Sequence, residues 1–431
     1  MALLCPVEQF RMPCRAMRKF RRNFPFEVVI PGMINTDPKK IKEVLERGVE
    51  EVIIKKHLEK RLRAGKKLRV KLGIDPTSTD LHLGHSIPLR KLKQFQELGH
   101  QVIFLIGDFT AQIGDPSGRV ATRKPLTVGQ IKRNMRDYVK QASKILDLNK
   151  VEVRYNSEWY KKKGISFLMR LSSQFSYARL IEREEFKRRI KRGIDVSMLE
   201  LLYPLLQGYD SVALKADVEI GGTDQKFNLL FARKVQKKYN LPQQDIMTLS
   251  LLIGTDGSAK MSKSFNNYIK LTEKPFKMFG QIMSIPDTLI WHYFRLLTDL
   301  PLKEIEKMEK EVRGFLLSPR NAKAKLAREI VKLYHGERAA QKAEVEFNRV
   351  FKEKKLPSEI PVFRTSKKML PILDLIFESG LASSRSQAKR LILQKAVEID
   401  KKLITDWKEK IKLKDGMVLR VGKRKFIKIK L

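Results

Sequence analysis

An alternation of strand-like and helix-like segments between residues 68 and 106 places the tightest limit on how this chain can fold. Residues 68–74 and 102–106 are short apolar runs, and residues 83–98 have the length and apolar spacing of a helix. A strand, a helix and a strand at this spacing form a right-handed parallel crossover. A similar strand at 218–220, followed by a helix over 225–239, repeats the pattern. The front half of the chain is therefore predicted to be α/β with a parallel sheet.

The segments around this unit have other patterns. Residues 37–62 carry apolar residues at helical spacing behind an Asp-Pro start, which predicts one helix. Residues 119–197 are predicted to be an insertion of helical pattern, and residues 275–351 to be mostly helical. A proline-marked linker follows at 357–361. The last segment, 370–431, is small and basic, with 16 Lys and Arg against 7 Asp and Glu.

Charge is the most unusual bulk property of the sequence. It has 89 Lys and Arg residues against 48 Asp and Glu, a formal net charge of +41. Such a charge favours a polyanionic partner, above all nucleic acid, although a lysine-rich or heat-adapted surface is an alternative cause. The two cysteines, Cys5 and Cys14, give neither a disulfide framework nor a structural zinc site, as expected in the reducing cytoplasm. No apolar run reaches membrane-spanning length.

Residues 1–32 precede the first well-formed helical segment and are rich in arginine and poor in acids. Organelle-targeting segments have this composition, but the serine content and the amphipathic period of such segments are missing here. We therefore expect a non-essential, disordered basic extension, with a targeting segment as the alternative.

The motif Asp80-Leu-His82-Leu-Gly84-His85 opens the helix that follows the first strand. In an open parallel sheet, ligands bind beyond the carboxyl ends of the strands, where helix N-termini offer unpaired N–H groups and a positive dipole to phosphate. The two histidines are three residues apart and share one helical face. Gly84 leaves room for a flat purine, and Asp80 is the expected N-cap. Half of a metal site is an alternative for the histidine pair, but no third ligand is nearby in the sequence.

The motif Lys260-Met-Ser-Lys263-Ser264 lies in a loop rich in glycine and serine, behind another apolar run. Such a loop can close over a substrate and bring two ammonium groups to a triphosphate, where positive charge stabilises the transferring and leaving phosphates. Lysine clusters are more often solvated surface. The upstream histidine motif nevertheless favours one nucleotide site formed by His82, His85, Lys260 and Lys263.

These motifs, in this order, resemble those of class I aminoacyl-tRNA synthetases. Three further stretches resemble the bacterial tyrosyl branch of that family: Gly114-Asp-Pro-Ser-Gly118, Tyr203-Pro-Leu-Leu-Gln207-Gly-Tyr-Asp210 and Gly221-Gly-Thr-Asp224-Gln225. The resemblance runs from about Met33 to the C-terminus. It implies activation of L-tyrosine with ATP, in the presence of Mg²⁺, to tyrosyl-adenylate and pyrophosphate. Transfer of tyrosine to the 3′-terminal adenosine of tRNA(Tyr) would follow. A homodimer is also implied.

The resemblance further implies roles for single residues. Asp210 would accept a hydrogen bond from the tyrosine hydroxyl, and Gln225 would lie near the substrate carboxylate. The residues implied for the α-ammonium group are Asp115, Tyr203 and Gln207. Those implied for ATP are Asp75, Thr77, Gly84, Gly222, Asp224, Lys263, Arg119 and Arg123. His82, His85, Lys260 and Lys263 would be catalytic through charge stabilisation, and no metal is expected to be bound by protein side chains.

The spacing of the tyrosine-side residues supports this assignment independently. Tyr203, Gln207 and Asp210 lie at i, i+4 and i+7, which is one face of a helix. A carboxylate in a closed pocket would be left unpaired by phenylalanine, which lacks the hydroxyl. The alternative is the polar face of an amphipathic surface helix. One position departs from the family pattern: where the family often has a second tyrosine for the substrate hydroxyl, this chain has Lys71. Whether Lys71 makes that contact is left open.

The C-terminal segment resembles an RNA-binding domain of the S4 type. Its characteristic helix would carry Arg385, Lys389 and Arg390 toward RNA, and residues 418–428 alternate like one half-exposed strand. Gln394 and Lys395 stand where the family usually has glycines in a turn, which leaves the shape of that loop open.

The predicted organisation has six parts. They are a basic extension at 1–32, a Rossmann-like catalytic domain at 33–245 with the insertion at about 119–197, a mobile loop and linker at 246–275, a helical domain at 276–355, a linker at 356–369 and the S4-type domain at 370–431. The predicted function is that of a tyrosine–tRNA ligase. The alternatives are a non-catalytic RNA-binding or splicing factor derived from a synthetase, a nucleotidyltransferase that does not use tRNA, and a tryptophanyl relative.

Overall fold

The computed structural model describes residues 34–117, 126–353, 360–422 and 425–431. The chain divides into two compact units, Met1–Glu273 with Ile285–Leu317, and Lys274–Ser284 with Ser318–Leu431. The extension expected at 1–32 lies outside the described residues.

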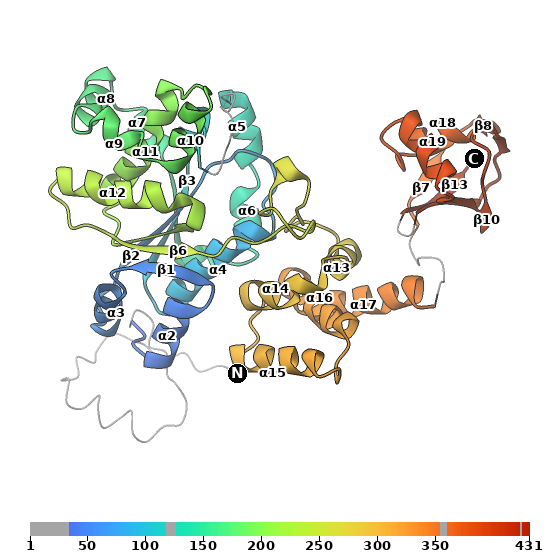
Figure 1. Cartoon of the computed structure of the whole chain (residues 1–431), viewed down its shortest axis with the longest axis horizontal. Coiled ribbons are helices and arrows are strands. Elements are labelled where there is room, and N and C mark those ends of the chain that lie inside the picture. The colour runs from blue at the N-terminus through green and yellow to red at the C-terminus, as the bar shows by residue number, and fades with distance from the viewer. Residues whose placement is uncertain (1–33, 118–125, 354–359, 423–424) are drawn as a thin grey trace, which may run out of the picture. The chain divides into compact units, whose positions relative to one another are not determined.

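The first unit is built on a six-stranded sheet with the strand order β1-β6-β5-β2-β3-β4 (Figure 1). Its strands are β1 (Val49–Ile53), β2 (Arg69–Ile74), β3 (Gln101–Ile106), β4 (Val151–Tyr155), β5 (Val218–Gly222) and β6 (Asp245–Leu249). β1 pairs antiparallel with β6, and the other neighbouring strands are parallel. The predicted parallel sheet is confirmed.

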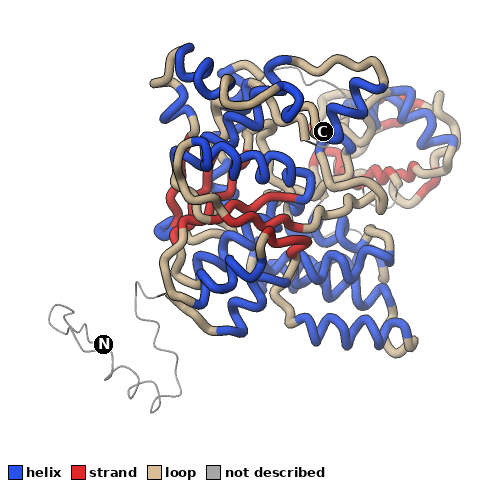
Figure 2. Tube along the Cα trace, turned by 60° about the vertical axis from the view of Figure 1, so that its left-hand side comes forward, coloured by secondary structure: helices blue, strands red, loops and turns tan. Residues whose placement is uncertain are grey.

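Two crossovers leave the centre of this sheet in opposite directions. β2 leads through α4 (Leu83–Glu97) to β3, and β5 leads through α12 (Lys226–Lys238) to β6. Because such crossovers are right-handed, α4 and α12 cover opposite faces, and Figure 2 shows helices on both sides of the strands. The strand order reverses between β2 and β5, which opens a crevice beyond the carboxyl ends of these two strands.

The prediction of one helix over residues 37–62 is wrong. The structure has there α2 (Pro38–Glu46), β1 and α3 (Lys55–Arg63). α2 begins behind its N-cap Asp37, and Gly48 takes a positive φ of 67° that turns the chain into β1. β1 then pairs along β6, with Ile53 opposite Ile246. Long-range pairing thus overrides a local helical pattern.

The segment 119–197 is not a purely helical insertion, because its middle forms β4, which extends the central sheet beside β3. The helices of its described part are α5 (Val128–Met135), α6 (Tyr138–Ala142), α7 (Ser157–Tyr160), α8 (Ile165–Ser172), α9 (Tyr177–Leu180) and α10 (Glu184–Lys191). α11 (Met198–Ala213) then returns the chain to the sheet. The domain limits also differ from those expected. β6 crosses the expected limit at residue 245, and α14 (Ile290–Leu297) and α15 (Leu302–Arg313) belong to the first unit.

In the second unit, α13 (Pro275–Met283), α16 (Pro319–His335) and α17 (Glu337–Phe351) pack together, with the rings of Phe279 and Phe347 5.3 Å apart. Short 3₁₀ helices of the first unit complete the described elements: η1 (Thr110–Gln112), η2 (Leu148–Lys150), η3 (Thr223–Gln225), η4 (Lys263–Phe265) and η5 (Asp287–Leu289). No helix in the described part of the chain is long and apolar enough to cross a membrane.

The C-terminal domain has a five-stranded sheet of order β10-β9-β12-β13-β7 and a two-stranded sheet of β11 and β8. Its elements are β7 (Val362–Arg364), β8 (Met369–Pro371), α18 (Ile372–Glu378), α19 (Arg385–Leu393), β9 (Val397–Ile399), β10 (Lys402–Leu403), β11 (Lys410–Lys412), β12 (Val418–Val421) and β13 (Lys425–Lys430). Residues 418–428 are therefore not one strand but parts of two antiparallel strands, which both place apolar side chains in the domain core. Lys395 has a φ of 53°, so it adopts the left-handed turn conformation that glycine favours.

Candidate active site

A cavity of about 640 Å³ lies at the crevice between β2 and β5. Its wall includes the ends of both strands, the start of α4, one face of α11 and the loop after β6. It is lined by these predicted residues: Asp75, Thr77, His82, Gly84, His85, Asp115, Tyr203, Gln207, Asp210, Gly222, Asp224, Gln225 and Lys260. Lys263 is not among the lining residues, and Arg119 and Arg123 lie outside the described residues.

The two histidines form the first turn of α4. His82 is the N-cap, and its Nδ1 accepts a hydrogen bond from the N–H of Gly84 at 3.2 Å. Nδ1 of His85 accepts one from the N–H of His82 at 3.2 Å, and the two ring centroids are 3.9 Å apart. Burial, assisted by the charge of Lys263, lowers the pKa of His85 to about 4 and holds the pKa of His82 well below its usual range. Both rings are therefore neutral at pH 7 with the proton on Nε2, which can donate to a phosphate oxygen.

Asp80 is not the N-cap of α4 that the sequence predicts. The helix begins at Leu83, so the cap position is His82, and Asp80 comes two residues too early. Its carboxylate lies 3.0 Å from Nζ of Lys270 and 3.5 Å from Nζ of Lys263. Burial alone would raise the pKa of Asp80, but the two lysines outweigh burial and leave its pKa below the ordinary value.

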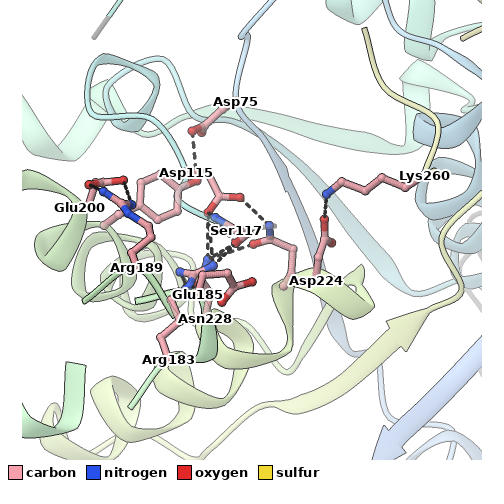
Figure 3. Close-up of polar contacts among 12 residues, drawn as sticks. Asp75, Asp115, Ser117, Arg183, Glu185, Arg189, Glu200, Asp224, Asn228 and Lys260 are labelled. Carbon is pink, nitrogen blue, oxygen red and sulfur yellow. Dashed lines mark hydrogen bonds and ion pairs between the residues drawn. The ribbon is translucent and has the colours of Figure 1, made fainter. Parts of the chain in front are cut away.

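The Lys260 loop is fixed by its own polar contacts and by two ion pairs. Within the loop, the amide of Asn267 donates to Asp256 at 2.9 Å and accepts from the N–H of Ser262 at 2.8 Å. Nζ of Lys260 lies 2.6 Å from the carboxylate of Asp224 (Figure 3), and Lys263 pairs with Asp80. The two lysine side chains are 33% and 24% exposed, so solvent screens these pairs and a ligand can displace them.

Both carboxylate oxygens of Asp75 accept hydrogen bonds from other side chains of the protein. Oδ1 accepts from the hydroxyl of Thr110 at 2.8 Å, and Oδ2 accepts from the hydroxyl of Tyr203 at 3.0 Å. Burial raises the pKa of Asp75 to about 7, and nearby Asp115 and Asp210 add to the rise while both hydrogen bonds oppose it. Because the hydroxyl of Tyr203 donates a hydrogen bond to Asp75, its oxygen lone pairs remain available to a donor in the cavity.

A buried arginine that the sequence analysis missed supports Asp115. Arg183 donates to Oδ1 of Asn228 at 2.9 Å and to the hydroxyl of Ser117 at 2.5 Å, and it lies 4.0 Å from Asp115. Asp115 itself accepts from the N–H of Ser117 at 2.9 Å and from the amide of Gln225 at 2.6 Å. Figure 3 shows Arg183, Asn228 and Ser117 gathered on one side of Asp115. Arg183 stands in an arginine-rich stretch, so no local signal distinguishes it from surface charge.

Asp210 lies buried on α11. Its Oδ1 accepts from the indole N–H of Trp159 at 3.0 Å, and its Oδ2 accepts from the amide of Asn156 at 3.3 Å. Burial raises the pKa of Asp210 to about 6, against the effect of the positive charge of Lys71 and of these hydrogen bonds. The carboxylate is therefore ionised at pH 7 and has acceptor capacity left for a hydroxyl donor.

Two further cavity residues are charged side chains from the middle of apolar strands. Lys71 of β2 is directly paired in register with Glu219 of β5. Lys71 stands out in the sequence as a departure from the family pattern, whereas Glu219 was not predicted. The signal was present, since opposite charges within two adjacent apolar runs predict a buried pair.

In the C-terminal domain, the three predicted RNA-binding residues lie on α19. The exposed Arg385 pairs with Asp374, and Nζ of Lys389 stands 3.9 Å from the ring centroid of Trp407. Arg390 is exposed on the same helix. The helix thus presents positive charge to solvent beside an aromatic ring.

Comparison with known proteins agrees with this geometry. Residues 63–352 match the family of class I tRNA synthetases (W and Y), and residues 370–416 match the S4 domain. The Tyrosine--tRNA ligase of Thermotoga maritima is 48% identical over 392 residues, which cover 91% of this chain and 98% of that protein. The ligase of the same name from Aquifex aeolicus is 45% identical over 392 residues, with 91% and 99% covered.

Solved structures support the fold. A C-terminally truncated mitochondrial tyrosyl-tRNA synthetase from Aspergillus nidulans superimposes with a TM-score of 0.62 at 24% identity, over 72% of this chain and 94% of that chain. A tyrosyl-tRNA synthetase from Archaeoglobus fulgidus, complexed with L-tyrosine, gives a TM-score of 0.57 at 22% identity, over 71% and 99%.

The chain belongs to the class I tRNA synthetases, and within them to the bacterial tyrosyl-tRNA synthetases. The expected enzyme class, a ligase that uses ATP as substrate, is confirmed, and the non-catalytic alternative is not supported. The expected S4-type domain is also confirmed.

Proposed function

We propose that the cavity activates L-tyrosine with ATP and that each half of it serves one substrate. The tyrosine carboxylate attacks the α-phosphorus in line, so the chain has no need of a nucleophile of its own. Catalysis then consists of positioning and charge stabilisation. The observation that carries the proposal is Asp210, a buried carboxylate held by Trp159 and Asn156 at the wall of the cavity.

The amino-acid half offers hydrogen-bond acceptors to the ammonium group of the substrate. It also offers a carboxylate to the substrate hydroxyl. Asp115 and the oxygen of Tyr203 are acceptors that line the cavity, and Gln207 lies one turn further along α11. Asp210 would accept a hydrogen bond from the phenol hydroxyl. Phenylalanine would leave this carboxylate desolvated and without a partner, which is the costly case for a buried polar group.

The nucleotide half offers positive charge and neutral donors to phosphate. Asp224, in the proposed role of ribose ligand, is paired with Lys260. Ribose hydroxyls that bind Asp224 would release Lys260 toward the triphosphate, where Nε2–H of His82 and His85 would also donate. No group of three or more His, Cys, Asp or Glu side chains in the described chain could hold a metal. Mg²⁺ would be carried by the phosphate oxygens of ATP, which suits its preference for oxygen ligands and retained water.

The tRNA and a second copy of the chain are the proposed macromolecular partners. The net charge of +41 and the exposed cations of α19 favour RNA. Large apolar side chains from α8 to α11 are exposed, and a second subunit would cover them: Ile165 (70%), Met169 (66%), Tyr177 (60%) and Met198 (72%). A cytoplasmic location remains a prediction from the cysteine content.

Exchange of labelled pyrophosphate into ATP, without RNA, tests the proposal. Tyrosine should support exchange, and phenylalanine and tryptophan should not. Folded protein that binds tRNA(Tyr) but exchanges with none of the three would contradict it.

A further inference from the structure

A buried ion pair lies in the wall of the amino-acid half of the cavity. Nζ of Lys71 is 2.8 Å from Oε1 of Glu219, and the two side chains are 1% and 2% exposed. A buried pair of this kind gives little net stability compared with apolar side chains of similar volume. Stability therefore does not explain why the ion pair lies at a substrate cavity.

Lys71 has no donor left for the substrate hydroxyl. Its ammonium group has three N–H donors and no acceptor. Besides Glu219, it donates to the hydroxyl of Ser211 at 2.8 Å and to the backbone carbonyl of Gln207 at 3.4 Å. All three donors thus have partners within the protein. Lys71 therefore acts on Glu219 and α11, not directly on the ligand.

Glu219 in turn fixes the amide of Gln207. Oε1 of Glu219 accepts from Nε2 of Gln207 at 3.2 Å, while Oε2 accepts from Ser211 at 3.0 Å and from the amide of Gln244. An ionised carboxylate only accepts hydrogen bonds, so the NH₂ side of Gln207 must face Glu219. Oε1 of Gln207 is left buried without a hydrogen-bond partner in the described structure. The side chain lines the cavity.

We propose that Glu219, held in place by Lys71, is a positioning residue that points the amide oxygen of Gln207 at the ammonium group of the substrate. A buried oxygen without a partner is costly, and a primary ammonium is the ligand group that supplies its missing donor. The inference rests on the proposed function, because the ammonium belongs to the amino acid that the cavity activates. It predicts selectivity for the amine, separate from the selectivity for the hydroxyl that Asp210 provides.

The decisive variant is Glu219→Gln, which keeps the volume but can either donate to or accept from Gln207. The amide then loses its fixed orientation. KM for tyrosine should rise about tenfold, the typical effect of one hydrogen bond to a charged group, with kcat changed less. Lys71→Met with Glu219→Gln removes both charges, so it avoids an unpaired buried lysine and should keep the same KM defect in a stably folded protein. Ser211→Ala, which touches both charges but not the amide, is the matched control.

Two inhibitors separate positioning from a general structural role. Tyramine has the phenol and the ammonium group, whereas 3-(4-hydroxyphenyl)propanoate lacks the ammonium. Glu219→Gln and the double variant should weaken tyramine about tenfold and leave the propanoate unchanged. Equal loss of both inhibitors, or unchanged tyramine binding, would overturn the inference. Absence of tyrosine-dependent exchange in the unaltered protein would instead contradict the proposed function.

Discussion

The two halves of the cavity differ in how their charges are held. On the amino-acid side, the charged groups of Asp210, Glu219 and Lys71 are buried, and each has at least two hydrogen-bond partners within the protein. On the nucleotide side, Lys260 lines the cavity, and Lys263 belongs to the same loop but does not line it. The two side chains are 33% and 24% exposed, and each is paired with a carboxylate.

This difference follows from what each half has to do. Rejecting phenylalanine needs a buried acceptor whose position does not relax, and a buried charge is tolerable only when it is paired and hydrogen-bonded. Stabilising the charge that develops on phosphate needs lysine side chains that can leave their carboxylate partners when the substrate binds. Exposed ion pairs contribute little to stability, so they can exchange one partner for another at low cost.

The largest effect on activity should come from a variant in the nucleotide half of the cavity. Lys260→Met removes a cation from the transferring phosphates, so kcat for pyrophosphate exchange should fall about 10²–10³-fold, as on removal of one transition-state donor. KM for tyrosine should stay unchanged, because the amino-acid half is built without this residue. Lys303→Met, at an exposed position of α15, is the control. A rise in KM for tyrosine with unchanged kcat would show that the two halves are not separate.

Asp210→Asn tests the amino-acid half of the cavity. The amide cannot reproduce the ionised acceptor, so the ratio of kcat/KM for tyrosine over phenylalanine should fall about 10²-fold, the upper range for one buried charged hydrogen bond. The measurement is exchange with each amino acid at several concentrations. Asp137→Asn, at an exposed position, should keep the ratio. Retained discrimination in a folded Asp210→Asn protein would remove Asp210 from its proposed role.

The sequence predicted those parts of the fold and the site that depend on local pattern. The apolar runs of β2, β3 and β5, the histidine motif on α4 and the face of α11 each have a signal within about ten residues. β1 could not be predicted in this way, because its extended form depends on β6, almost 200 residues later in the chain. β4 likewise lies within a stretch rich in helical pattern and becomes a strand through its pairing with β3.

The supporting residues of the site were missed for the same reason. Arg183 is 66 residues from Ser117, and Trp159 is 51 residues from Asp210. Burial distinguishes Arg183 from an ordinary surface arginine, and the hydrogen bond to Asp210 distinguishes Trp159 from an ordinary core tryptophan. Both are properties of the folded chain. Asp80 shows the opposite error: it is a good N-cap residue, but it stands two positions before the actual N-cap, His82, and its carboxylate pairs with two lysines instead.

Arg183→Lys tests the buried support of Asp115 and should have an effect of intermediate size on KM for tyrosine. Lysine cannot reproduce the planar fork that reaches Asn228, Ser117 and Glu185 together. Asp115 should lose its fixed position, and KM for tyrosine should rise about tenfold, with a fall of about 2 kcal/mol in the free energy of unfolding. Arg179→Lys alters an exposed pair with Glu182 and should change neither quantity measurably. Equal effects of both variants in kinetics and denaturant unfolding would contradict a special role for burial.

The smallest predicted effect is a pH dependence confined to the amino-acid half. The pKa of Asp210 is raised to about 6, so lowering the pH through 6 protonates the carboxylate and removes the acceptor that the tyrosine hydroxyl needs. KM for tyrosine should therefore be about fourfold higher at pH 5.5 than at pH 8, because about three quarters of the groups are then protonated. His85, with a pKa of about 4, stays neutral over this range, so kcat should show no histidine inflection. Asp210→Asn should abolish the rise in KM. A rise that persists in that variant with a midpoint near 7 would assign it to Asp75, whose pKa is raised to about 7, and would contradict the role given to Asp210.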